Sequence, residues 1–240
     1  MRVVGLTGGI ASGKSTACRY IKELFPEIPI IDADCLSRQA VQRGHLPYWL
    51  LRWVLPCECF DRHGELIRPV LASLIFSQSV QGRQLKRLVE RCIHPWVVWR
   101  IYAAMFWYWL VGCGRVVVDV PLLFEGRFDR ILMMSTTILI DPVTEEVQLE
   151  RLRTRNPGMT ESEARNRIAA QMPLAQKRLL ARWIVPNDFS GQGTFKDRLR
   201  QLWESQDELK ASFCRDQVLQ RLLPLALLGA VAIWMGCRPG

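Results

Sequence analysis

The feature that most constrains the fold of this chain is a glycine-rich turn that begins at Gly8. From that residue the sequence satisfies the phosphate-loop pattern G-x-x-x-x-G-K-[ST]. A short apolar run precedes the turn, and apolar residues at helical spacing follow it: Ala17, Tyr20, Ile21 and Leu24. A strand, a phosphate-binding turn and a helix in this order predict the first βα unit of an α/β protein that binds a nucleoside triphosphate.

Each part of this loop has a physical role in binding phosphate. Glycine lets the backbone approach an anion without a Cβ in the way, and the N–H groups form a nest at the positive end of the following helix. We expect Lys14 to contact the β- and γ-phosphates and the Ser15 hydroxyl to be a direct ligand of Mg²⁺. The residues expected to bind ATP are Gly8, Gly9, Ile10, Ala11, Ser12, Gly13, Lys14, Ser15 and Thr16.

Two later strands bring carboxylates toward this loop. Residues 28–32 form a short apolar run that ends in Asp-Ala-Asp, and residues 115–119 form a β-branched run that ends in Asp119. Carboxyl ends of parallel strands meet at the edge where open α/β sheets bind ligands. Asp32 and Asp34 are therefore candidates for metal contact and for a general base, and Asp119 is a candidate to hold a Mg²⁺-bound water. Asp34 is also a candidate N-cap of the next helix, a role compatible with the first.

Charge and composition narrow the class of partner. The chain has 240 residues, 49% of them hydrophobic, and a formal net charge of +9. Eight basic residues against two glutamates fall within residues 151–182, without an interleaved aromatic residue. This pattern favours a lid that closes over phosphates and argues against a nucleic-acid partner, although a solvated helix face is the alternative for any single arginine.

The cysteines and the N-terminus indicate where the protein works. Eight cysteines are scattered without a C-x-x-C pair, which favours reduced thiols in an intracellular, cytoplasmic-facing protein and argues against a zinc site. The first strand begins at residue 2 or 3, so we expect no targeting peptide.

Residues 44–114 interrupt the alternation of strands and helices and predict an inserted helical substrate domain. The expected helices are Pro69–Ser77, Gly82–Ile93 and the aromatic-rich Trp96–Val111. We expect the aromatic side chains to be packed between layers, in the core.

The second half of the chain returns to alternating elements. The expected elements are a strand at 136–140, a helix at 144–155, a capping box from Thr160 to Glu163, a strand at 183–186 and an amphipathic helix from about 195 to 220. Residues 144–182 would form the lid region, within a domain that spans residues 1–205. Residues 206–240 would form a C-terminal helix with a hydrophobic tail. Leu222–Cys237 holds sixteen uncharged, mostly apolar residues, which suit either a tail anchor in a mitochondrial or other organelle membrane, or a docked helix or dimer contact.

Several motifs in one order resemble the dephospho-CoA kinase family. Besides the loop they are Ile31–Asp34, Gly64–Arg68, Leu74–Phe76, His94-Pro95, Asp119–Glu125, Gln148–Leu152 with Arg155, Arg167-Ile168 with Gln171, Lys177, and Ile184–Asn187. They cover about residues 2–190. The chain is similar in particular to eukaryotic dephospho-CoA kinase domain-containing proteins, some of which also end in a hydrophobic segment. It departs from many family members at Ala11, where they have glycine, and alanine is tolerable at this position if its φ is negative.

The resemblance implies transfer of the ATP γ-phosphoryl to the ribose 3′-hydroxyl of dephospho-CoA, the last step of coenzyme A biosynthesis, with Mg²⁺. It implies a P-loop, nucleoside-monophosphate-kinase-like parallel sheet with a helical CoA-binding domain and a lid. Asp34 would be the base, Lys14 would hold ATP, and Arg151 or Arg155 would stabilise the transferred charge. The substrate side would comprise Asp32, Asp34, Arg68, His94, Pro121, Leu122 and Phe124. The alternatives are a small-molecule kinase with another acceptor and a catalytically silent, membrane-anchored scaffold.

Overall fold

The computed structural model describes residues 1–75, 80–188 and 192–208. The end of the predicted amphipathic helix and the hydrophobic segment Leu222–Cys237 lie outside these residues. Among the helices within the described ranges, none combines the length and the apolar character needed to cross a membrane.

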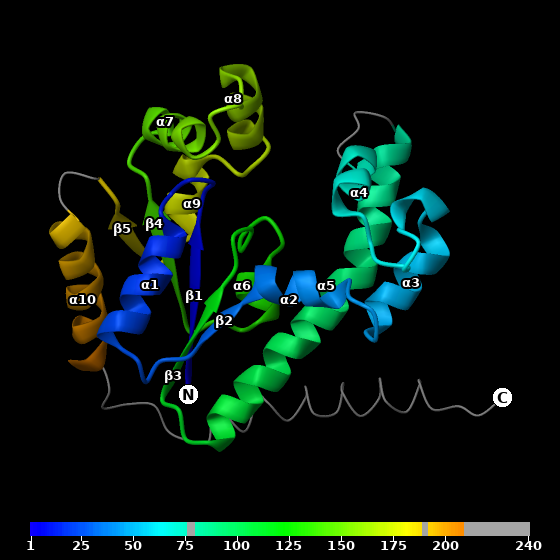
Figure 1. The fold of residues 1–240 in the computed structure, drawn as a ribbon. Helices are drawn as coiled ribbons and strands as arrows, with labels where there is room; N and C mark the ends of the chain where they lie inside the picture. The colour runs from blue at the N-terminus through cyan, green and yellow to red at the C-terminus, as the bar shows by residue number, and fades with distance from the viewer. Residues whose placement is uncertain (76–79, 189–191, 209–240) are drawn as a thin grey trace.

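A five-stranded parallel sheet forms the centre of the molecule, in the order β2-β3-β1-β4-β5 (Figure 1). Its strands are β1 (Arg2–Gly8), β2 (Ile30–Asp32), β3 (Arg115–Asp119), β4 (Thr136–Asp141) and β5 (Trp183–Pro186). Because β1 is the middle strand, the loop that follows it lies at the centre of the carboxyl edge. Asp119 is in register with Leu6 on one side and with Asp32 on the other, so the expected carboxylates meet at that edge.

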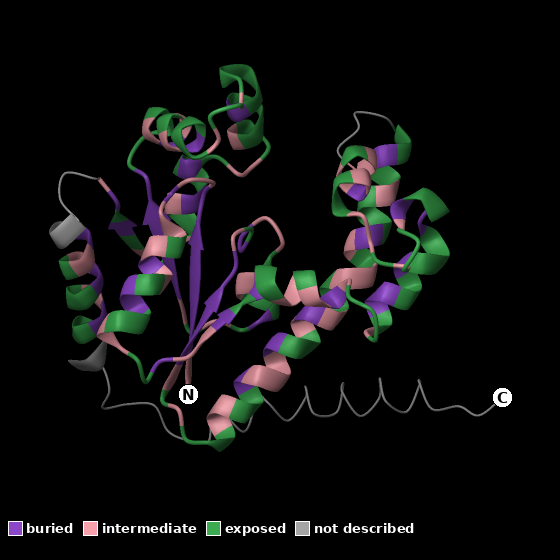
Figure 2. Cartoon of the chain, viewed as in Figure 1, coloured by how far each residue is buried: buried purple, intermediate pink, exposed green. Residues whose placement is uncertain are grey.

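Helices cover both faces of the sheet, as the buried strands in Figure 2 show. Helices α1 (Lys14–Leu24) and α10 (Gln192–Glu208) pack together on one face, where Tyr20, Phe195 and Trp203 are buried. The other face is covered by α2 (Ala33–Ala40), the short α6 (Phe128–Ile131) and the C-terminal half of α5 (Val80–Leu110). Successive side chains of β1 and β3 therefore enter the two cores in turn, which explains why these strands are apolar throughout.

The predicted helical insertion has a small core of its own. It comprises α3 (Leu46–Val54), a 3₁₀ turn at Cys57–Cys59, α4 (Arg68–Ile75) and the first half of α5. Its buried residues are Leu51, Leu55, Cys59, Leu71 and Val89. Figure 1 shows this group of helices standing to one side of the sheet, joined to it by α2 and α5.

Helix α5 contradicts two expectations. It runs unbroken for 31 residues with Pro95 inside it, where the sequence predicted two helices. Proline removes one backbone hydrogen bond and crowds the preceding turn, but packing of both halves against separate cores outweighs this cost.

The aromatic residues of α5 are also less buried than expected. The side chains buried against the sheet are Val97, Ile101 and Met105, which are not aromatic and stand four residues apart. Phe106 and Trp107, in contrast, are 50% and 60% exposed. Side chains four apart lie on one face of a helix, so the aliphatic positions exclude these two aromatic residues from it.

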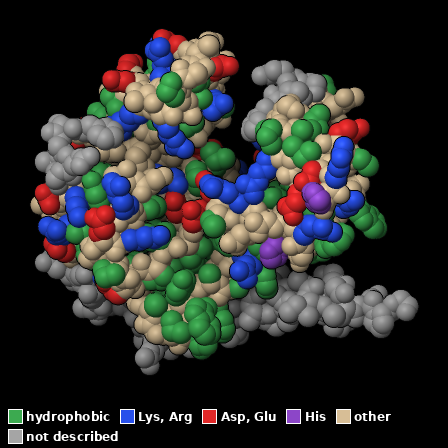
Figure 3. Space-filling model, viewed as in Figure 1, with side chains coloured by type: hydrophobic (Ala, Val, Ile, Leu, Met, Phe, Trp, Pro, Cys, Tyr) green, Lys and Arg blue, Asp and Glu red, His purple; other side chains and the backbone are tan. Residues whose placement is uncertain are grey.

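The lid region stands at the carboxyl edge of the sheet. It comprises α7 (Glu145–Arg155), α8 (Glu161–Ala169) and α9 (Leu174–Leu180) (Figure 1). The capping box is confirmed, since the Thr160 hydroxyl accepts from Glu163 N and the Glu163 carboxylate accepts from Thr160 N. In the space-filling view the surface is notched between the α7–α8 lobe and the helical insertion (Figure 3).

Candidate active site

The phosphate loop takes the conformation that its glycines allow, with one exception. Gly13 has φ of +92° and a Cβ there would lie 2.0 Å from the Asn187 amide nitrogen, so only glycine fits. Ala11 has φ of +56°, in the left-handed region, so the condition for an unstrained alanine at this position is not met. Alanine at this position carries strain that glycine would not.

The Lys14 ammonium is held by Asp119. Its Nζ donates to Asp119 Oδ1 at 2.6 Å, with both side chains largely buried. The Cys18 thiol donates to the other oxygen, Oδ2, at 3.3 Å. Burial and the Asp119 carboxylate raise the pKa of Cys18 to about 12, so the thiol stays a neutral donor. This arrangement satisfies both oxygens of the carboxylate that ends β3.

The Asp-Ala-Asp motif divides its roles between two aspartates. Asp32 is the N-cap of α2, since its Oδ1 accepts from Cys35 N at 2.9 Å. The alternative role of N-cap that we considered for Asp34 is therefore wrong. Partial loss of hydration raises the pKa of Asp34, against the lowering effect of Lys14, and the nearby Asp32 and Asp119 carboxylates add to the rise. Asp34 is thus free of the capping role and more basic than an ordinary aspartate.

The expected substrate residues come from three elements. Arg68 begins α4 and donates to the Arg38 carbonyl oxygen at 3.3 Å, which places it beside α2. The His94 ring, on α5, lies edge-on to the Phe128 ring with centroids 5.6 Å apart. The insertion therefore contacts both the helix that carries Asp34 and the segment that follows β3.

The segment after β3 turns at the carboxyl edge of the sheet. The Pro121 carbonyl oxygen accepts from Thr7 Oγ1 at 3.1 Å, next to the phosphate loop. The Leu122 side chain is 46% exposed, whereas Phe124 is buried in the core. Of these three, Leu122 presents its side chain to solvent, and Phe124 helps to fix the turn.

The lid arginines lie on one face of α7. Arg151 and Arg155 are four residues apart, and Arg151 Nη2 donates to the Asn187 carbonyl oxygen at 2.7 Å. Burial lowers the pKa of Arg151, but a guanidinium remains charged in proteins. Asn187 also donates from Nδ2 to the Ser12 carbonyl oxygen at 2.8 Å, so it connects Arg151 to the phosphate loop.

Two further side chains hold the tip of the loop. Gln148 Nε2 donates to the Ile10 carbonyl oxygen at 2.8 Å, and Gln171 Oε1 accepts from Ile10 N at 2.9 Å. Gln148 lies in the first turns of α7, and Gln171 lies between α8 and α9. Both backbone groups of Ile10 are therefore held by the lid region.

The base of the lid contains two ion pairs. Arg178 on α9 donates to both oxygens of Asp141, at 2.7 and 3.0 Å, where β4 ends. Lys177, which has no exposed side-chain surface, pairs with Glu125 at 2.8 Å, and the same Glu125 oxygen accepts from Met172 N at 3.1 Å. These contacts fasten α9 to the sheet and to the segment after β3.

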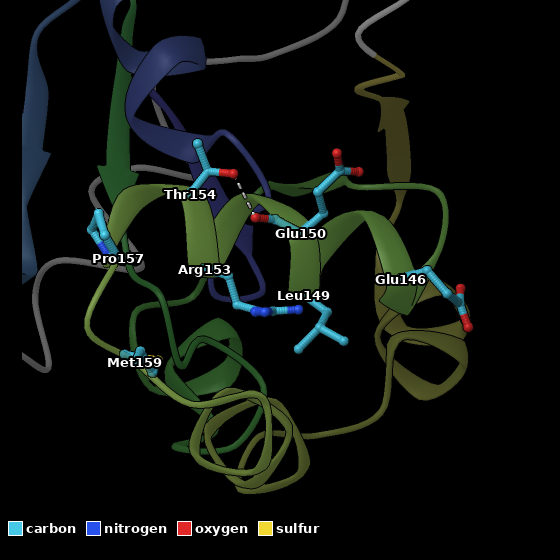
Figure 4. A pocket seen from close by; sticks show the side chains of 7 residues that line it. All are labelled: Glu146, Leu149, Glu150, Arg153, Thr154, Pro157 and Met159. Carbon is cyan, nitrogen blue, oxygen red and sulfur yellow. Dashed lines mark hydrogen bonds between the residues drawn. The ribbon is translucent and has the colours of Figure 1, made fainter.

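A separate pocket of about 380 Å³ lies between α7 and the turn that follows it (Figure 4). Its walls are Glu146, Leu149, Glu150, Arg153, Thr154, Pro157 and Met159. Arg153, on its wall, pairs with Glu161 at 3.3 Å across the turn between α7 and α8. No predicted site residue lines this pocket, so it is a gap within the lid and not part of the candidate site.

Sequence reasoning gave no individual role to several residues that the structure brings to the site: Cys18, Glu125, Gln148, Gln171 and Asn187. Cys18 could have been found, because it lies one helical turn after Lys14 on the same face. The others are remote in sequence from the loop, and no local pattern signals their contacts.

Comparisons with known proteins agree with one another on family and fold. The family model described as "Dephospho-CoA kinase" matches residues 2–192. The dephospho-CoA kinase of Arabidopsis thaliana is 37% identical over 190 residues, which cover 79% of this chain and 78% of that protein. The dephospho-CoA kinase domain-containing protein of Danio rerio is 38% identical over 201 residues, 83% of each chain. A solved dephospho-CoA kinase from Campylobacter jejuni matches with a TM-score of 0.64 at 19% identity, over 88% of this chain and 100% of that one, and shows the same fold.

Proposed function

This chain belongs to the dephospho-CoA kinase family, and from that premise we propose that it phosphorylates the ribose 3′-hydroxyl of dephospho-CoA. The products are CoA and ADP, as in the last step of coenzyme A biosynthesis. The observation that carries the proposal is the meeting of the phosphate loop, Asp34 and Asp119 at one edge of the sheet, between the lid and the helical insertion.

Asp34 is the group we assign as general base. It lies in the first turn of α2, and its raised pKa makes it a better proton acceptor than an ordinary aspartate. As the acceptor oxygen forms its bond to the γ-phosphorus, the hydroxyl proton passes to Asp34. The bond between the γ-phosphorus and the bridging oxygen breaks, and ADP leaves with that electron pair.

The remaining residues neutralise and position charge, which is most of what phosphoryl transfer asks of a protein. Lys14 would exchange its Asp119 partner for the phosphates when ATP binds. Arg151 and Arg155 would approach the transferred group from the lid, and lid closure would exclude water that hydrolyses ATP. Arg68, His94 and the turn at Pro121 and Leu122 would contact the acceptor.

The residues at the loop also fit Mg²⁺. Magnesium binds through one or two protein oxygens together with substrate phosphates and water, and the Ser15 hydroxyl and the Asp119 carboxylate provide such oxygens. Ser15 would be the direct ligand and Asp119 would act through water. The ion would supply positive charge that neutralises the phosphates of ATP.

The proposal is tested by measuring ADP release from Mg-ATP with purified protein and dephospho-CoA, beside AMP, shikimate and pantothenate. We expect turnover with dephospho-CoA alone, and CoA as the product by mass. Turnover with a different acceptor would replace the substrate assignment. ATP binding without turnover on any acceptor would favour the silent scaffold, which the comparisons do not support.

Asp34→Asn should lower kcat by about 10²- to 10⁴-fold, because the amide cannot accept the hydroxyl proton. ATP affinity, measured by calorimetry, should stay near the wild-type value, since the phosphates are held by the loop. Asp197→Asn is the control, since Asp197 is an exposed aspartate of α10 that lies outside the site. Unchanged kcat in Asp34→Asn would remove Asp34 from the role of base.

Membrane contact through residues 222–237 and the compartment of the protein stay predictions from the sequence. Flotation of the full chain and of a chain that ends at Arg221 with lipid vesicles tests the first. A membrane anchor requires that only the full chain floats.

A further inference from the structure

Two glutamine side chains of the lid region hold the same residue of the phosphate loop. Gln148 comes just before the lid arginines of α7, and Gln171 comes after α8. One donates to the Ile10 carbonyl oxygen and the other accepts from the Ile10 N–H, at 2.8 and 2.9 Å. The segment between them, residues 149–170, is therefore anchored to Ile10 by a hydrogen bond just before it and another just after it.

The polarity of the two contacts is fixed by the backbone. A carbonyl oxygen only accepts and an N–H only donates, so Gln148 must present its NH₂ group and Gln171 its oxygen. The two amides are therefore not interchangeable, although the residues are chemically the same.

The loop is shaped to admit these side chains. Gln148 is 2% exposed, and a Cβ on Gly9 would lie 2.5 Å from its Nε2. Glycine at position 9 therefore makes room for the lid amide. Because Gln171 takes the Ile10 N–H, the nest that receives phosphate is formed by other amides of the loop.

We propose that Gln148 and Gln171 are positioning residues that register the lid on the phosphate loop, so that Arg151 and Arg155 are placed relative to the bound phosphates. This inference rests on the proposed function. Neither glutamine touches the reacting atoms. A lid that lost this register would not stay closed over bound ATP, and its arginines would miss the transferred group.

The opposite polarities give a sharp test, because Gln→Glu is nearly isosteric. Glutamate at 171 keeps an acceptor for the Ile10 N–H, whereas glutamate at 148 loses the donor and turns a carboxylate toward a carbonyl oxygen. Gln148→Glu should lower kcat by about tenfold or more, as misplaced groups do, with a change in ATP affinity of no more than about threefold. Gln171→Ala should behave likewise, and Gln171→Glu should recover most of that loss.

Gln176→Glu is the matched control, since Gln176 is an exposed glutamine on the same lid region. Gln148→Met, which removes the donor at similar volume, carries the same expectation if Gln148→Glu does not fold. If negative charge alone mattered, kcat would fall equally in Gln148→Glu and Gln171→Glu. If the two glutamines served only to fill space, both glutamate variants would keep the wild-type kcat. Either result, or an equal loss of kcat and ATP affinity, overturns the proposal.

A second readout separates this inference from the proposed function. In the wild-type protein, Mg-ATP should slow hydrogen exchange of backbone amides in residues 149–170, and Gln148→Glu should abolish that protection while ATP still binds. This needs no acceptor. Failure of the wild type to phosphorylate dephospho-CoA would overturn the function and leave the exchange test intact, whereas equal protection in both proteins would overturn the register.

Discussion

Ala11 is the residue at which the phosphate loop is strained. Its φ of +56° costs an L-residue with a Cβ roughly 1 kcal/mol relative to glycine. Ala11→Gly should therefore raise the free energy of unfolding by up to about 1 kcal/mol, measured by urea denaturation. The gain should appear without a change in the slope of the denaturation curve, because the fold is unaltered.

Ala175→Gly is the control for that substitution. Ala175 lies in helix α9, where the same change should lower stability by about 0.5–1 kcal/mol. A loss of stability in Ala11→Gly as well would mean that the left-handed conformation is not what decides the cost at position 11.

Single residues of the site were predictable where their neighbours in sequence determine their place. Lys14 and Asp119 belong to a loop and a strand end, and both positions follow from local patterns. The capping role of Asp32 and the φ of Ala11 depend on the geometry of one turn, which composition does not specify. Gln148 and Gln171 belong to motifs shared with the family, but their contacts with Ile10 span 138 and 161 positions of sequence.

At the scale of elements, α9 is fastened by the buried Lys177. Lys177→Met would leave Glu125 without its cation, and breaking such a pair should cost about 3 kcal/mol of unfolding free energy. The double variant Lys177→Met, Glu125→Gln should cost clearly less than the sum of the two single changes, because the amide oxygen introduced at position 125 can still accept from Met172 N. A double-mutant cycle by urea denaturation measures this, and strict additivity would contradict the coupling.

Helices and strands were predicted well where their hydrophobic residues followed a single period, and poorly where tertiary packing outweighed a local signal in the sequence. The sheet strands and the capping box of α8 were expected from their patterns. Pro95 predicted a break, yet α5 continues because two cores hold its halves. The helix α3 was not predicted, since nearly every residue from Leu46 to Val54 is apolar or aromatic and shows no polar face.

At the scale of the whole molecule, α5 joins two hydrophobic cores into one unit. Val89 belongs to the core of the insertion, and Ile101 belongs to the core beneath the sheet. The insertion should therefore unfold together with the sheet, in one cooperative transition. Calorimetry should give equal calorimetric and van't Hoff enthalpies.

Val89→Ala tests the same point from one side. Removing this buried side chain weakens only the insertion core, yet the whole transition should move to lower temperature. A separate low-temperature transition in that variant would show that the insertion unfolds alone.

The ion pair between Lys14 and Asp119 has a consequence for inhibition. Before nucleotide arrives, the strongest positive charge of the loop is already matched by a carboxylate at 2.6 Å. A bare anion must compete with that internal counter-ion, whereas a nucleotide that arrives with its own cation offers Asp119 a replacement. Inorganic phosphate and sulfate should for this reason be poor competitors of Mg-ATP, which inhibition constants in the ADP-release assay would measure.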